Sequence, residues 1–153
     1  MTLEQQFVAV FQLMLAALLG GLIGLDRDRH QQGAGLRTHI LVGTGACLFT
    51  VLSALAFSSG DPSRVASQIL PGIGFLGAGT ILRYGRSVHG LTTAASIWIT
   101  AAVGMAVGTG AWFLALCATL LIWFVLAVIR RAERRKLDQK DVPSAGNQPE
   151  APG

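Results

Sequence analysis

The sequence predicts an all-α polytopic integral membrane protein with about five transmembrane helices. Of its 153 residues, 52% are hydrophobic and only 13% are charged, whereas a soluble domain carries about 25% charged residues. The charges are also segregated: only Arg37 lies between Arg29 and Asp61, and none lies between Arg86 and Arg130. Uncharged stretches of roughly 20 residues cross a bilayer, and a soluble chain of this length does not bury several such helices.

Five apolar stretches account for the expected spans, at residues 7–25, 40–57, 69–82, 91–107 and 111–129. The third is the shortest, with 14 residues, and it crosses a bilayer only if it extends back to Val65. It also contains Pro71 among several glycines. We therefore expect either a thin helix that its neighbours pack closely or a helix that is broken near Pro71.

The basic residues predict how the chain is oriented. With five spans, Arg64 is the only Lys or Arg on one side of the membrane, and the other eleven lie on the opposite side. The basic side is expected to be cytoplasmic, which places the N-terminus outside. Residues 1–129 are then a transmembrane domain, and residues 130–153 are a cytoplasmic tail that is first basic and then disordered in composition. No Lys or Arg precedes the first span, so we expect a permanent span rather than a cleaved signal peptide.

A basic pI of about 9.8 does not indicate a nucleic-acid partner here. Six of the twelve basic residues follow the last apolar stretch, between Arg130 and Lys140. This placement is typical of a segment held at a membrane surface. The expected partners are the lipid bilayer and another membrane protein, and a homo-oligomer is left open.

The sequence predicts neither an enzyme nor a metal site. No arrangement of a nucleophile with a base is recognisable, and the expected spans carry ionisable residues only at their ends. His30, His39 and His89 share the predicted cytoplasmic side, but their spacing matches no metal site, so no metal or cofactor is expected. Cys47 and Cys117 lie inside apolar stretches and are predicted to be small buried residues.

Glycines dominate the third apolar stretch. Residues 72–77 match the dinucleotide pattern G-x-G-x-x-G, but that motif needs a preceding strand and an acidic residue about 20 positions later, where this chain has Ile97. Small residues at such spacing instead predict close helix packing. The alternative is an exposed backbone that binds a ligand or an ion. The residues with this packing prediction are Gly72, Gly74, Gly77 and Gly79 in the third stretch, Gly20 with Gly24 in the first, and Gly104 with Gly108 in the fourth.

Polar residues at two membrane edges are the candidate functional residues. Asp61, Arg64 and Gln68 follow one another at the start of the third stretch, on the outer side. Asp61 is expected to cap a helix whose first residue is Pro62, and an i, i+3 ion pair would join it to Arg64. A functional polar cluster would explain all three residues. Arg37 lies on the cytoplasmic side, as do the alternating charges of residues 26–29. These charges are either interfacial stop signals or a docking surface.

Three blocks of the sequence resemble the MgtC/SapB family. They occur in the family's order and cover about residues 15–112. Any one block alone is weakly specific, whereas the three together are highly specific. The blocks are Gly-Leu-Arg-Thr-His at residues 35–39 with residues 41–49, then residues 61–68 with residues 72–79, and finally Gly-Leu-Thr-Thr-Ala-Ala at residues 90–95 with Trp98.

The resemblance implies a bacterial inner-membrane protein linked to magnesium limitation or stress, and in some members to survival inside host cells. In members of that kind the family is associated with restraining the F-type ATP synthase, so the expected function is contact with another membrane protein. The alternative is a transporter or channel for Mg²⁺ or another cation, with the glycine-rich third helix along its path. Arg37, Asp61, Arg64 and Gln68 occupy family motif positions, which strengthens their candidacy.

Two departures from the family pattern bear on function. Position 26 is Asp where the family usually shows Glu before Arg. Longer members carry a soluble C-terminal domain, whereas this sequence has a short tail after Arg130. Activities that depend on that domain, including virulence-type function, are therefore not carried over to this chain.

Overall fold

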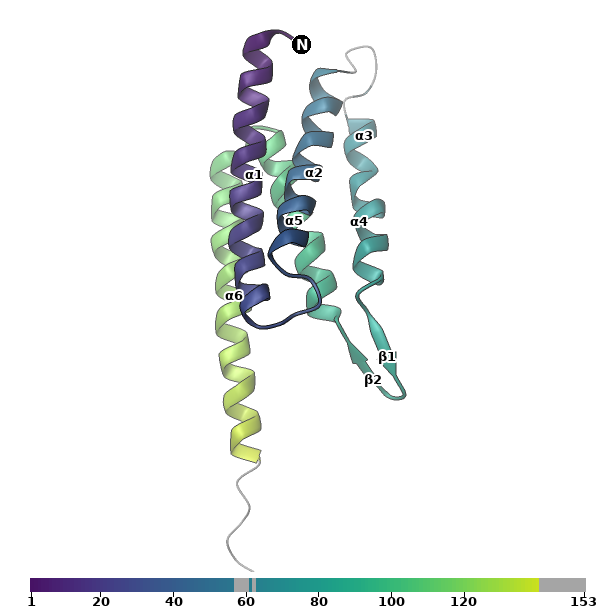
Figure 1. Ribbon diagram of the computed structural model, residues 1–153, viewed down its shortest axis with the longest axis vertical. Helices are drawn as coiled ribbons and strands as arrows, with labels where there is room; N and C mark the ends of the chain where they lie inside the picture. Colours follow the sequence, from purple (N-terminus) through teal and green to yellow (C-terminus); the bar gives the residue numbers. More distant parts are fainter. Residues whose placement is uncertain (57–60, 62, 141–153) are drawn as a thin grey trace, which may run out of the picture.

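The structure, a computed structural model, describes residues 1–56, 61 and 63–140, and side chains as far as Val128. Four long helices lie side by side, two short helices lie at one edge, and a small hairpin follows them (Figure 1). The hairpin is antiparallel, with Leu82 paired to His89. In chain order the elements are α1 (Leu3–Arg29), α2 (Leu36–Leu55), α3 (Ser63–Ser67), α4 (Ile69–Ala78), β1 (Leu82–Tyr84), β2 (Ser87–His89), α5 (Leu91–Gly108) and α6 (Trp112–Lys140).

Three helices of the described chain, α1, α2 and α5, are long and apolar enough to cross a membrane. The apolar part of α6, Trp112–Val128, is somewhat shorter. These four correspond to the first, second, fourth and fifth expected spans. Large apolar side chains point away from the bundle, and Phe7 and Phe113 are 75% and 80% exposed, which suits a lipid environment. The prediction of an all-α polytopic membrane protein is therefore confirmed.

The third apolar stretch does not form one continuous span. Its first ten residues form α4, and the five-residue α3 precedes them, with a turn at Gln68 between the two helices. A ten-residue helix is about 15 Å long, half of a hydrocarbon core of roughly 30 Å. The interruption lies at Gln68, three residues before Pro71. Pro71 is the third residue of α4, where a backbone N–H would have no partner within that helix, so the helix tolerates a proline there. The expected end at Leu82 is wrong, because α4 ends at Ala78 and Leu82 begins the hairpin.

Glycines bring α1, α2 and α5 into close contact. A Cβ at Gly20 or Gly24 of α1 would come within 2.8 Å of the α2 backbone. One at Gly104 of α5 would overlap the backbone of Gly43 in α2, and one at Gly108 would come within 2.9 Å of the α2 backbone. Only residues without a side chain allow these distances, so the packing predicted for both pairs is confirmed.

The core lies between the long helices, and only one of the two cysteines belongs to it. Cys47 is fully buried, as predicted. Cys117, which was predicted to be buried, is exposed. The reason is that α6 packs on the bundle through one face, which carries the buried Ala115 and Thr119. Position 117 is two residues from each and lies on the opposite side of the helix.

Candidate functional site

The Asp61 carboxylate caps the start of α3. One of its oxygens accepts hydrogen bonds from the backbone N–H and from the hydroxyl of Ser63, both at 2.8 Å. These two bonds, the backbone one first, lower the pKa of Asp61 below its usual value, so the exposed carboxylate is ionised at neutral pH. The predicted capping role is confirmed, although the expected first helical residue, Pro62, lies outside the described residues.

The predicted ion pair between Asp61 and Arg64 is not formed. An ion pair that the structure does form, between His30 and Asp26 at 3.7 Å, lies at the end of α1. The Asp61 carboxylate bonds to Ser63 instead. Both members of the expected pair are exposed, and solvent screens their attraction.

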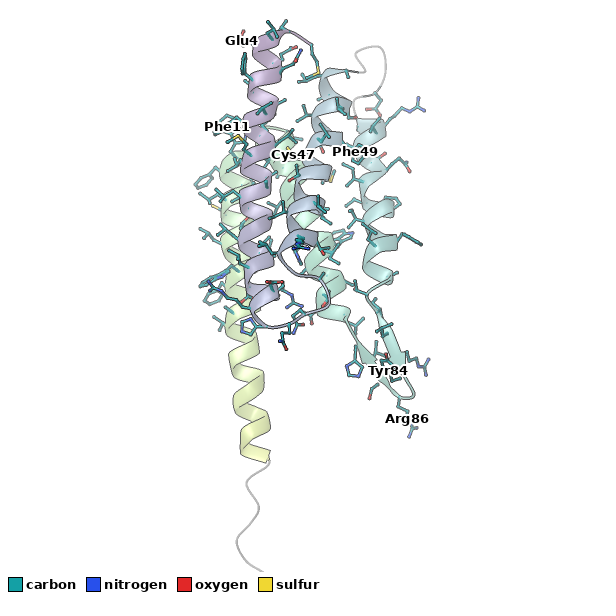
Figure 2. All side chains as sticks on the ribbon, viewed as in Figure 1. Glu4, Phe11, Cys47, Phe49, Tyr84 and Arg86 are labelled. Atoms are coloured by element: carbon teal, nitrogen blue, oxygen red, sulfur yellow. The ribbon has the colours of Figure 1, made fainter. Side chains whose placement is uncertain are left out.

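An apolar groove of about 470 Å³ separates α2 from the α3–α4 pair. Figure 2 labels Phe49, which belongs to its α2 wall. The lining residues of α3–α4 recur at helical spacing, so one face of that pair forms the second wall. Gln68 is the polar side chain of the lining, and Arg64, one helical turn earlier, is exposed and is not part of the lining. The full lining is Leu41, Val42, Gly45, Ala46 and Phe49 on α2, and Val65, Gln68, Ile69, Gly72, Ile73 and Leu76 on α3–α4.

Arg37 does not join the other predicted site residues. It is the second residue of α2, whereas Asp61 follows the other end of that helix. The helix extends 18 residues beyond Arg37, to Leu55, which is about 27 Å. The structure therefore brings Asp61, Arg64 and Gln68 together at one end of the bundle and leaves Arg37 exposed at the other.

The glycines of α4 differ from those of the bundle. A Cβ at Gly72 or Gly74 would meet nothing within 4 Å, and one at Gly77 would make ordinary contact with Ala94, at 3.5 Å. At Gly79 the nearest atom, at 3.3 Å, belongs to the preceding turn. Within the described chain, Gly72 and Gly74 do not pack closely on another helix. Their packing role stays a prediction for contact with something outside the chain.

The charges at the end of α1 divide between the surface and the core. Arg29 is exposed, whereas Arg27 is only 2% exposed. The Arg27 guanidinium donates to the Thr93 hydroxyl of α5 at 3.2 Å and to the Gln32 side-chain oxygen at 3.0 Å. Interpreting residues 26–29 as a wholly interfacial cluster is therefore wrong for Arg27, which ties α1 to α5.

His39 continues this buried polar network into α2. Its Nδ1 donates to the Gly35 carbonyl at 2.8 Å, because a carbonyl oxygen can only accept. Its Nε2 lies 3.1 Å from the hydroxyl oxygen of Ser96, and that hydroxyl donates its one proton to the Thr93 carbonyl at 2.8 Å. Side chains of three helices thus meet in one buried network, and sequence reasoning did not single it out.

Gln12 is a second buried polar residue that sequence reasoning missed. Its side chain is 7% exposed, and its amide donates to the carbonyls of Val107 and Gly108 at 3.0 and 3.4 Å. These carbonyls end α5 and lack partners within their own helix. The Val107 carbonyl also accepts from the backbone N–H of Gly110 at 3.0 Å. In a bilayer such groups need internal partners, and Gln12 adds one to each.

Helical spacing is the signal that would have predicted the burial of Gln12 and of Arg27. Gln12 and Arg27 are in phase with Ala16, Leu19 and Ile23, which form the buried face of α1. A polar residue in that phase is expected to face the other helices and to be paired there.

The histidines and carboxylates are dispersed. His30 lies beside Asp26, His39 is inside the bundle, and His89 is on the exposed hairpin beside Tyr84. In the part of the chain that the structure describes, no group of three His, Cys, Asp or Glu side chains is placed to hold a metal ion.

The fold and the placement of these groups define a class of protein: a helical membrane protein with a glycine-packed bundle, polar groups near its two ends, and a peripheral helical arm. The chain belongs to the MgtC family, whose sequence model matches residues 13–135. The resemblance to the MgtC/SapB family is thereby confirmed. No solved structure matches the chain.

Curated relatives from three bacteria illustrate the similarity. The "Putative magnesium transporter YhiD" of Escherichia coli K12 is 41% identical over 138 residues, covering 85% of this chain and 64% of its own length. Protein MgtC of Salmonella typhimurium LT2 is 44% identical over 140 residues, with 92% and 60% covered. Protein MgtC of Brucella abortus is 50% identical over 115 residues, with 75% and 48% covered. The chain thus spans between about half and two thirds of the length of these relatives.

Proposed function

We propose that the chain is a non-enzymatic protein of the bacterial inner membrane that serves magnesium homeostasis by contact with another membrane protein, with the F-type ATP synthase as the first candidate. The position of α4 carries this proposal. The second family block lies there, at the periphery of the bundle (Figure 1). Phe75 is 81% exposed, and the backbone at Gly72 and Gly74 has open space before it. A neighbouring membrane protein can reach these residues without any change in the bundle.

The second candidate is a Mg²⁺ transporter, which the name of the Escherichia coli relative favours. A path for Mg²⁺ needs oxygen ligands, usually one or two carboxylates beside retained waters. The groove beside α4 is lined by apolar residues and one amide, Gln68, and Asp61 lies outside it at the start of α3. These positions favour the contact proposal over a path along α4.

A pair of cross-linking variants tests the contact. A photo-activatable residue replaces Phe75 on α4 or Phe113 on α6, which are 81% and 80% exposed and serve as a matched pair. After illumination of intact cells at low Mg²⁺, immunoblotting asks whether subunits of the F-type ATP synthase are attached. We expect attachment at position 75 and not at position 113.

The contrary results are equally clear. Equal attachment at both positions would mean that cross-linking reports random collisions in the membrane and not a specific contact at α4. Attachment at neither position, with both variants normally abundant, would remove the ATP synthase as partner.

A further inference from the structure

The β1–β2 hairpin extends away from the helix bundle, which does not cover it (Figure 1). Every residue of both strands is exposed, and Leu82, Tyr84 and Val88 are 52%, 67% and 47% exposed. A two-stranded hairpin is at best marginally stable in water, and a further strand or a packed face is what stabilises it. Both faces are open in the described chain, so a stable hairpin needs a contact from outside it.

The base of the hairpin is fixed at one end of α5. Gly90 alone separates His89, the last residue of β2, from Leu91, the first residue of α5. Gly90 has a φ of +86°, and a Cβ there would overlap the carbonyl oxygen of Thr80, so it packs directly on the segment that leads from α4 into β1. Because α5 is long and apolar enough to cross a membrane, the base of the hairpin lies at the membrane surface.

The length of the hairpin keeps much of it among the lipid headgroups. Each strand has three residues, which is about 10 Å. The headgroup layer on each side of a bilayer is roughly 5–8 Å thick. Even an upright hairpin therefore keeps half or more of its length in this layer, and any tilt brings the turn closer to it. Figure 2 shows Tyr84 and Arg86 at the far end of the hairpin, and both are residue types whose long side chains reach back to an interface.

The hairpin carries two cations and no acid. They are Arg83 and Arg86, and no Asp or Glu occurs in the sequence between Asp61 and Glu133. The Arg83 Nε donates to the Gly85 carbonyl at 3.0 Å, which leaves its terminal nitrogens available. Neither guanidinium forms an ion pair with a residue that the structure describes. The hairpin therefore complements an anion, and the anions of the headgroup layer are lipid phosphates.

We infer that the hairpin binds the headgroups of anionic phospholipids in the leaflet where α5 begins. The guanidinium groups of Arg83 and Arg86 offer paired N–H donors that match phosphate oxygens. Leu82 and Tyr84 are two residues apart on β1 and share one face, whereas Arg83 lies on the other. The first face packs on the boundary between headgroups and acyl chains, where tyrosine is enriched in membrane proteins. The inference is independent of the protein that α4 contacts.

Hydrogen exchange of the full chain in nanodiscs tests the contact. One sample contains phosphatidylcholine alone, and the other contains equal parts of phosphatidylcholine and phosphatidylglycerol. Mass spectrometry follows the backbone amides of residues 82–89. We expect these amides to exchange about tenfold more slowly with phosphatidylglycerol, because each basic residue near an anionic surface adds about fivefold to binding.

Single substitutions separate the hairpin from the rest of the basic surface. Arg86→Gln is expected to reduce the slowing by phosphatidylglycerol about fivefold, and Arg83→Gln repeats the test on β1. Arg86→Lys keeps the charge and is expected to keep most of the slowing. The control is Arg29→Gln, which removes the same charge from an exposed position at the neighbouring end of α1 and is expected to leave exchange of the hairpin unchanged.

The contrary outcomes are distinct. Equal exchange in the two nanodiscs would show that anionic headgroups do not bind the hairpin. A reduction in Arg29→Gln as large as in Arg86→Gln would assign the effect to the net charge of the chain. Rapid exchange in both nanodiscs, with protection only in native membrane vesicles, would make a protein the occupant and overturn the inference.

Discussion

The bundle of α1, α2 and α5 and the arm of α3 and α4 use glycine in opposite ways. In the bundle, Gly24 and Gly104 lie against the backbone of α2, and no side chain fits there. In the arm, Gly72 and Gly74 have open space beside them. The bundle is therefore complete within one chain, whereas the arm presents bare backbone and a groove to its surroundings. Stability is expected to depend on the bundle and function on the arm.

The sharpest test of this contrast replaces one glycine in each region by leucine. Gly104→Leu forces a side chain into the Gly43 backbone and is expected to destabilise the folded chain by about 3 kcal/mol or more, as severe overpacking does. Gly74→Leu is expected to change stability by less than about 0.5 kcal/mol. Thermal unfolding in detergent and the amount of folded protein in membranes measure both. Equal losses would show that the arm packs as closely as the bundle.

The buried network gives the next largest effect. Arg27→Ala removes the hydrogen bonds to Thr93 and Gln32 and leaves a cavity between α1 and α5. We expect a loss of about 2–3 kcal/mol. The control is Arg29→Ala, two residues along the same helix and exposed, which should stay within about 0.5 kcal/mol. The same unfolding assay separates them, and a neutral Arg27→Ala would remove the network from the account of stability.

Gln12→Leu is expected to have a smaller effect within the bundle. It leaves the carbonyls of Val107 and Gly108 without their side-chain donor. Hydrogen bonds between transmembrane helices contribute about 0.6 kcal/mol on average, so a loss of about 1 kcal/mol is expected. Gln6→Leu, on the exposed first turns of α1, is the control. The Val107 carbonyl keeps the backbone N–H of Gly110 as a partner, so a loss as large as that of Arg27→Ala would contradict this expectation.

Asp61→Asn is expected to leave abundance unchanged, because an amide oxygen still caps α3. The pKa of Asp61 is lowered in the folded chain, so its bonds to Ser63 contribute at neutral pH and weaken as the pH falls through that pKa. We expect growth of the variant at low Mg²⁺ to resemble that of a deletion strain. Growth at the wild-type rate would show that Asp61 only caps the helix and has no functional role.

How much the sequence could predict differs between the same two regions. The spacing of Gly20 with Gly24 correctly predicts close packing, because both lie on one helix face. The identical reasoning at Gly72 and Gly74 cannot say whether the neighbour is in the same chain, so only the structure shows that nothing in the described chain covers them.

The polar residues show a similar limit. The capping role of Asp61 follows from local sequence, and it is confirmed. Arg27 and Arg29 look alike as charges beside a span, and which one is buried depends on helix phase and on where α5 packs. The break at Gln68 depends on how α3 and α4 pack on α2 and α5. The spacing of residues along the chain carries no information about that packing.

The most direct test of the central claim, that the chain acts by contact and does not conduct Mg²⁺, is ion flux into sealed vesicles. Purified full-length chain is reconstituted, and Mg²⁺ entry is followed with an entrapped fluorescent indicator. We expect entry at the rate of protein-free vesicles, while deletion of the gene in the source cell still impairs growth when Mg²⁺ is scarce. Protein-dependent entry that Asp61→Asn abolishes would contradict the account and establish the transporter instead.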